Sequence, residues 1–289
     1  MNEATRMADI YANAHVVLSA TATEDCQVGF LQKRAEPLVI KYAQHVQKND
    51  GVQEVRARRI ESYDCERETQ KVDYTLFDRG WGMQERFLAC RIIHFLPDEV
   101  LFECPAKREY ECGAASKEDM IPSHCQGFRI FADLQAAPSM EGLKFGFLWL
   151  AILWDYSKMT LTYGSDSLPA LSGLAASVEH LKPGKYIAGL WERDIVLQLG
   201  WRVDLRSTTR RWHGTKYGDI LGPTFSWSSH VRPMDDGACR SPKDICTLVN
   251  SRVHLAKHNP YGEVQHASLP ERAGSTWRGH GFMAEDHRA

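Results

Sequence analysis

The chain has 289 residues, of which 43% are hydrophobic and 25% are charged, a composition typical of a globular protein with room for two or three small domains. Its formal net charge of -2 provides no strong electrostatic attraction for nucleic acid or for an anionic membrane surface. We therefore expect neither of these as a partner.

The first residues contain no basic segment followed by an apolar core, as a secretory signal would. The longest apolar run, FGFLWLAILW at residues 145–154, is about half as long as a membrane-spanning helix. We expect a cytoplasmic protein without a membrane span.

Residues 3–14 are predicted to form an amphipathic helix, because Met7, Ile10, Tyr11 and Ala14 recur at helical spacing. The run HVVLSA at residues 15–20 then predicts a buried strand. From Thr21 to Val72 the chain is polar and charged without a sustained period, which favours a solvated, flexible insertion outside the core. We assign this insertion no function.

A short helix is predicted to follow, capped by Asp78, with Trp81, Glu85 and Leu88 at helical spacing. The run RIIHFL at residues 91–96 predicts a second buried strand, and a Pro-Asp-Glu turn leads into a further strand, VLFEC, at residues 100–104. Two buried strands separated by a helix indicate a βαβ unit in a parallel sheet, with an extra strand beside it.

The sequence divides into three consecutive parts: residues 1–112, a mainly helical region at 113–222, and a β-rich region at 223–289. In the helical region, residues 147–159, 166–182 and 190–201 are the predicted helices, and four tryptophans are expected to pack in the core: Trp149, Trp154, Trp191 and Trp201. In the last region, TFSWSS, ICTLVNSRVHLA and GEVQHASL read as short strands separated by turns.

The sequence contains no complete catalytic or metal-binding signature. A phosphate-binding glycine loop, a GxSxG elbow and an HExxH helix are all missing, and the histidines are scattered singly. The eight cysteines form no CxxC pair, and the spacing of Cys104, Cys112, His124 and Cys125 matches no zinc pattern, which favours free thiols and no metal. No cofactor is implied by these patterns.

Several ordered segments nevertheless resemble the fungal heterokaryon incompatibility (HET) domain proteins. MADIYANAHVVLSATATEDCQVGFL resembles the family's helix–strand segment, RGWGMQERFLACRIIHF its RGWTLQER-type motif with the following strand, and VLFEC its next segment. The motif residues are Arg79, Gly80, Gln84 and Arg86, together with Trp81 and Glu85. Segments downstream, such as YIAGLWERDI and NPYGEV, resemble the region that often follows the domain.

Two departures from the family pattern stand out. The YxALSYxWG-like and WIDxxCIDQ-like stretches that normally precede these segments do not occur, so we expect residues 1–112 to be a HET domain lacking its N-terminal part. Gly82 and Met83 stand where the family tends to carry Thr-Leu, which should loosen the helix without moving Glu85.

The resemblance implies a role in self/non-self recognition and programmed cell death, with protein partners and self-association in incompatibility signalling. It also implies a likeness to TIR domains, which have a flavodoxin-like parallel sheet and in some members cleave NAD. TIR domains carry a Trp four residues before the catalytic Glu, as Trp81 and Glu85 are spaced here. By this resemblance Glu85 is catalytic in the intact domain, Trp81 supports it, and NAD is a substrate. A domain that lacks the first strands and their loops also lacks half of the pocket, so we expect this chain to be inactive as an enzyme.

Two alternatives stay open beside this enzymatic interpretation. In one, the chain is a non-catalytic binding or scaffold paralogue. In the other, the motif has a structural role: Trp81 fills the interface between helix and sheet, and Glu85 pairs at the surface with Arg79, Arg86 or Arg91. This alternative stays open because W-x-x-x-E is a short and common spacing.

Overall fold

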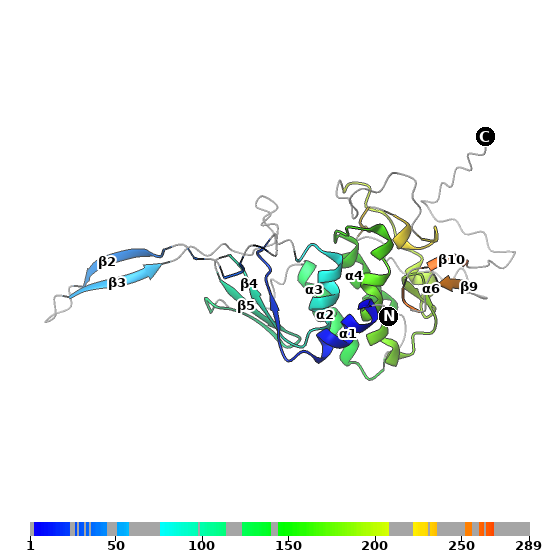
Figure 1. The fold of residues 1–289 in the computed structure, drawn as a ribbon, viewed down its shortest axis with the longest axis horizontal. Coiled ribbons are helices and arrows are strands. Elements are labelled where there is room, and N and C mark those ends of the chain that lie inside the picture. The colour runs from blue at the N-terminus through cyan, green and yellow to red at the C-terminus, as the bar shows by residue number, and fades with distance from the viewer. Residues whose placement is uncertain are drawn as a thin grey trace. The chain divides into compact units, whose positions relative to one another are not determined.

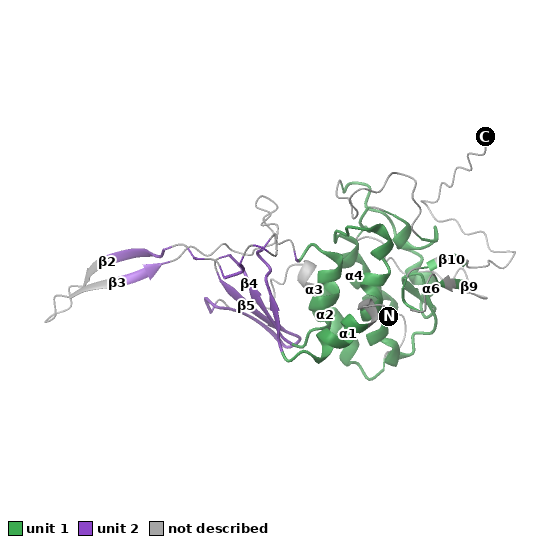
Figure 2. Cartoon of the chain, in the orientation of Figure 1, with its two compact units in different colours: residues 1–15, 77–90, 123–289 green, residues 16–76, 91–122 purple. Residues whose placement is uncertain are grey.

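A computed structural model describes the fold over most of the chain (Figure 1). The description covers residues 3–23, 27, 29–31, 33–34, 36–44, 51–57, 76–97, 99–113, 123–139, 144–207, 222–230, 232–235, 252–255, 260–262 and 264–268. The chain forms two compact units, 1–15 with 77–90 and 123–289, and 16–76 with 91–122 (Figure 2). Segments of the two units alternate along the sequence. The division into three consecutive parts, 1–112, 113–222 and 223–289, stays a prediction.

The first unit is mainly helical. Its long helices are α1 (Glu3–Asn13), α2 (Gly80–Leu88), α3 (Ser123–Ala136) and α4 (Lys144–Ser157), and its short ones are η2 (Gly164–Asp166), η3 (Pro169–Leu171), α5 (Ser172–Ser177), η4 (Glu179–Leu181), α6 (Ile195–Gln198) and η5 (Trp227–Ser229). It also holds two hairpins, β7 (Tyr186–Ile187) with β8 (Leu190–Trp191), and β9 (Arg252–Leu255) with β10 (Val264–Ser268).

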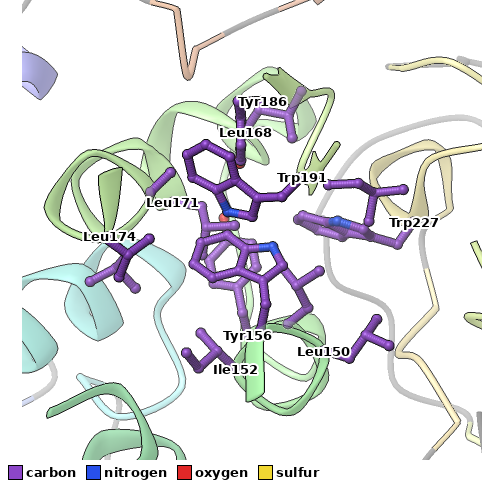
Figure 3. Close-up of a cluster of buried hydrophobic side chains, with 14 of the residues drawn as sticks. Leu150, Ile152, Tyr156, Leu168, Leu171, Leu174, Tyr186, Trp191 and Trp227 are labelled. Carbon is purple, nitrogen blue, oxygen red and sulfur yellow. The ribbon is translucent and has the colours of Figure 1, made fainter. Parts of the chain in front are cut away.

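The core of this unit combines aliphatic side chains with large aromatic rings (Figure 3). Trp149, Trp191 and Trp227 are each at most 1% exposed, so these large side chains contribute most of their surface to hydrophobic burial. Trp149 and Trp191 are two of the four tryptophans predicted as core anchors. The other two, Trp154 and Trp201, are half-buried and pack at the edge of the same core.

A buried tight turn organises this core. Between β7 and β8, Ala188 and Gly189 both have positive φ, 49° and 92°, as a two-residue hairpin turn requires. The carbonyl oxygen of Gly189 accepts a hydrogen bond from Trp149 Nε1 at 3.0 Å, and Ser226 Oγ donates to the carbonyl of Ala188 at 2.6 Å. The predicted helix at 190–201 is therefore wrong over its first half, where the chain forms β8, and only α6 is helical.

The second unit contains a mixed four-stranded sheet in the order β1 (Val17–Ser19), β4 (Ile92–Phe95), β5 (Val100–Cys104) and β6 (Lys107–Tyr110). Strands β1 and β4 pair in parallel, which confirms the parallel pairing predicted for these two strands. The other pairings are antiparallel, so the sheet is mixed rather than parallel throughout.

Strand β1 differs from the buried strand that was predicted. It lies at the edge of the sheet with β4 as its partner, and Leu18 is 60% exposed. By contrast, β4 is buried on alternate residues, which confirms the strand predicted in RIIHFL. A β-branched run therefore identified both strands but did not separate an edge strand from an inner one.

The predicted flexible insertion contains an ordered hairpin, formed by β2 (Leu38–Gln44) and β3 (Gly51–Ala57). Its described side chains from 38 to 41 and from 54 to 56 are exposed. Because neither face is buried there, the sequence does not have to alternate apolar and polar residues, which is the pattern that predicts a strand. The expectation that this segment lies outside the core holds for the hairpin.

Two further sequence expectations are corrected within the first unit. TFSWSS contains the helix η5 rather than a strand, because the Ser226 side chain caps the turn by accepting from the backbone N–H of Ser228. Residues 166–182 form the short pieces η2, η3, α5 and η4 rather than one helix. Of the predicted strands in the tail, Arg252–Leu255 and Val264–Ser268 are confirmed, and residues 245–251 lie outside the described part.

Candidate functional site

The motif RGWGMQER occupies α2, and its residues fix this helix to several distant segments of the helical unit. The helix begins at Gly80 without the predicted Asp78 cap, since the residue before it is Arg79, whose side chain makes no capping hydrogen bond. Asp78 instead uses its carbonyl oxygen, which accepts from Thr160 N at 2.6 Å and Thr160 Oγ1 at 2.9 Å.

Gly80 lies too close to its neighbours for any side chain. Its backbone N–H donates to the carbonyl of Thr160 at 2.9 Å, and a Cβ built on it would stand 2.5 Å from Leu161 Cδ2. A larger residue at this position would require the side chain of Leu161, which packs directly against Gly80, to move.

Gln84 is fully buried and anchors the start of α5. Its Oε1 accepts a hydrogen bond from the backbone N–H of Gly173 at 2.8 Å. This N–H belongs to the first turn of α5, where no helical partner exists and the residue before the helix, Leu171, cannot cap it. The Gln84 side chain thus acts as a capping group supplied by another helix.

Trp81 packs inside the helical unit, where α2 contacts α1, α3, α5 and η3. Its ring is half-buried against the core, and its Nε1 donates to Asp166 Oδ2 on η2 at 3.1 Å. Trp81 thus packs among the helices of this unit.

Glu85 lies one turn after Trp81, is partly exposed, and accepts a hydrogen bond from the phenol of Tyr11 on α1. Burial raises the pKa of Tyr11 well above its ordinary value, and the hydrogen bond to Glu85 and the charge of that carboxylate raise it further.

The remaining motif residues divide between solvent and the helical unit. Arg79 is exposed, whereas the guanidinium of Arg86 lies over the rings of Phe77 and Phe128, 4.9 and 5.6 Å from their centroids. Gly80, Trp81, Gln84 and Arg86 thus position the helix. Glu85 is the motif acid that remains accessible for chemistry or binding.

The sequence alone does not indicate Tyr11 and Asp166 as partners of the motif. Tyr11 belongs to the apolar face of a predicted helix, and Asp166 lies 85 positions after Trp81 in the chain. Neither pattern carries a local signal, since both contacts arise from the packing of α1 and η2 around α2.

A second polar cluster, which the sequence alone also does not indicate, lies within the sheet unit. His94 Nδ1 is 3.0 Å from Thr21 Oγ1, and His94 Nε2 is 3.1 Å from Glu103 Oε2. Arg108 Nη2 lies 3.2 Å from the other oxygen of Glu103. Since Thr21, His94 and Glu103 are all at most 3% exposed, this network joins β4, β5, β6 and the segment that follows β1 internally rather than forming an open site.

Three described cysteines, Cys90, Cys104 and Cys112, are free thiols. Within the ranges described above, no three His, Cys, Asp or Glu side chains are grouped so as to hold a metal ion. The side chains of His124 and Cys125 lie outside the described part. The same ranges contain no helix with the length and apolar character of a membrane span.

Comparison with known proteins identifies the N-terminal part of the chain. Residues 1–85 match the model of the family described as heterokaryon incompatibility protein (HET), so the N-terminal part of the chain is similar to this family. The match includes α1, with Tyr11, and the motif up to Glu85. No curated protein and no solved structure matches the chain.

Proposed function

We propose that this chain is an effector or signalling protein of fungal heterokaryon incompatibility, and that the partly exposed side of α2 around Glu85 is its functional surface. The observation that carries the proposal is the HET match over residues 1–85, in which the motif neighbours of Glu85 are used for packing while Glu85 remains accessible. Programmed cell death and self/non-self recognition are the biological roles that this proposal assigns.

The first mechanism to consider is cleavage of NAD, with Glu85 as the catalytic residue. Breaking the bond between ribose and nicotinamide develops positive charge at the anomeric carbon, which a positioned carboxylate stabilises. Two observations support Glu85 in this role: Tyr11 fixes its carboxylate, and Trp81 lies four residues earlier on the same helix face. Asp166 holds the Trp81 ring in one orientation.

The second mechanism is signalling by association, without catalysis. The same contacts support it, because a carboxylate bonded to Tyr11 also ties α1 to α2. In this mechanism the α2 surface binds a protein partner, and Glu85 contributes stability or recognition rather than chemistry.

Expression in a fungal or yeast host separates these mechanisms. The chain is expressed alone and as a fusion to an upstream HET segment that carries the YxALSYxWG-like and WIDxxCIDQ-like stretches. Each form is compared with its Glu85→Gln variant and with Asp133→Asn, which removes an exposed carboxylate from α3 as a matched control. Growth, protein level and cellular NAD are measured together.

We expect the fusion to arrest growth, and Glu85→Gln to abolish the arrest at an unchanged protein level while Asp133→Asn has no effect. Loss of NAD that depends on Glu85 supports the enzyme. Growth arrest with intact NAD supports association. A fusion that is expressed as a folded protein and leaves growth unaffected would refute the effector proposal.

A further inference from the structure

The β2–β3 hairpin exposes an unusual amount of apolar surface for a segment of a globular protein. Leu38, Val39, Ile40 and Val55 are 67%, 43%, 47% and 47% exposed, and they lie on only two paired strands. A two-stranded hairpin alone is marginally stable in water, and three or more strands are normally needed. Among the residues that the structure describes, no third strand pairs with this hairpin.

The register of the hairpin sorts its described side chains onto two faces. Ile40 pairs with Val55 and Leu38 with Ala57, which places these four on one face. Lys41 pairs with Glu54 and Val39 with Arg56, which places these on the other face. Lys41 Nζ and Glu54 Oε1 also form an ion pair at 3.3 Å.

The edge of β3 that faces away from β2 is complementary to the same edge of a second copy of the chain. In an antiparallel pairing of two copies about a twofold axis at Val55, Val55 faces Val55 of the second copy, and Glu54 faces Arg56 in both directions. One face of the resulting four-stranded sheet then carries a continuous apolar row of Ile40 and Val55 from each copy. The opposite face carries two intermolecular Glu–Arg pairs.

Other pairings of the hairpin lack this complementarity. A twofold axis at Glu54 would place two carboxylates opposite each other, and an axis at Lys41 on β2 would oppose two ammonium groups. An axis at Ile40 on β2 brings no pair of opposite charges together, since Lys41 would face Val39. The charges thus select the β3 edge and its register about Val55.

We propose that the β2–β3 hairpin is a self-association element, through which two copies of this chain join their β3 edges into a four-stranded antiparallel sheet. The partner it fits is a second copy, because both the apolar row and the charge pairs are satisfied by the same three residues, Glu54, Val55 and Arg56. This role is independent of Glu85 and of any catalytic activity.

Charge reversal on the full chain tests the proposal by sedimentation over a concentration series. Arg56→Glu leaves the internal Lys41–Glu54 pair in place and turns both intermolecular pairs into Glu–Glu contacts, so it should weaken dimerisation at least about tenfold. Glu54→Arg should weaken it likewise, by creating Arg–Arg contacts. Arg129→Glu, at an exposed position on α3, is the matched control and should leave dimerisation unchanged.

An equimolar mixture of the Arg56→Glu and Glu54→Arg chains is the decisive experiment, because it tests whether positions 54 and 56 of two copies face each other. Each chain then offers the partner two charges opposite to its own, so a heterodimer should form with an affinity near that of the wild type. Recovery in the mixture also shows that both variants are folded. In addition, Val55→Cys should give a disulfide-linked dimer under mild oxidation, beyond the background of the wild-type chain, whereas Val39→Cys should not.

Three results would overturn the proposal. A wild-type chain that stays monomeric at every concentration shows that the hairpin does not self-associate. A dimer that is insensitive to Arg56→Glu uses another surface. A mixture that fails to recover dimerisation, although both chains give a folded circular dichroism spectrum, shows that Glu54 and Arg56 do not face each other.

Discussion

Because Gly80 lies close to Leu161, Gly80→Ala should destabilise the wild-type chain but should be neutral or stabilising when Leu161 is also replaced by Ala. In the wild type, Gly80→Ala places a Cβ 2.5 Å from Leu161 Cδ2 and 3.1 Å from Leu161 Cγ. Leu161 is only 4% exposed, so it has little room to move away. Overpacking of this kind costs about 1–3 kcal/mol.

The same substitution also improves helix propensity, by at most about 1 kcal/mol at the start of α2. We therefore expect Gly80→Ala to lower the free energy of unfolding by about 1–2 kcal/mol. Leu161→Ala alone should cost about 2–5 kcal/mol because it leaves a cavity. In that background the added methyl meets empty space, and Gly80→Ala should become neutral or stabilising.

Urea denaturation of the four chains in this double-mutant cycle measures the effect, with an expected coupling free energy of about 1–3 kcal/mol. Gly82→Ala, on a different side of the same helix, measures the propensity gain separately. Additive effects of Gly80→Ala and Leu161→Ala would show that Gly80 is not held against Leu161, and would refute this account of its packing.

Three further predictions follow from the helical unit. Trp81→Phe keeps an aromatic ring but removes the N–H that donates to Asp166, and should lower the free energy of unfolding by about 1–2 kcal/mol in urea denaturation; an unchanged stability would exclude this bond as an anchor. Burial raises the pKa of Tyr261 from 10.0 to about 12, helped by a hydrogen bond to Glu179 and its charge. Because the folded state then binds more protons than the unfolded state, stability present below pH 10 is lost as pH rises towards 12, and Tyr261→Phe should flatten this loss in alkaline unfolding curves; equal slopes for both chains would contradict it. A fragment of residues 1–112 should be insoluble or lack cooperative unfolding, since it separates α1 and α2 from α3, α5 and η3, with which they pack; a soluble fragment with a sharp unfolding transition would oppose this.

Local sequence patterns determined the elements that bury one face. The helix at residues 3–13 follows from apolar periodicity, and the strands in RIIHFL and VLFEC and helix α4 follow from apolar runs of the lengths typical of strands and helices. The HET resemblance also comes from the sequence alone, and the family match over residues 1–85 confirms it. The likeness to TIR domains and the catalytic role of Glu85 stay predictions.

Patterns failed where solvent or a single distant contact decides the conformation. The β2–β3 hairpin is exposed on both faces, so no alternation marked it, and β1 carries the same β-branched residues as an inner strand although it lies at an edge. Residues 190–201 contain apolar residues at helical spacing, yet the turn at Ala188 and Gly189 directs the chain into β8 first. In each case the local sequence is compatible with two structures, and packing chooses between them.

The functional motif shows the same division. The sequence by itself placed Trp81 and Glu85 one turn apart on a helix, because helical geometry fixes that spacing. Only the tertiary structure decided what each side chain does, since Asp166, Gly173 and Tyr11 approach α2 from segments more than 70 residues away. A periodic pattern specifies which face of a helix is buried, but the partners of its polar groups depend on how distant parts of the chain pack around it.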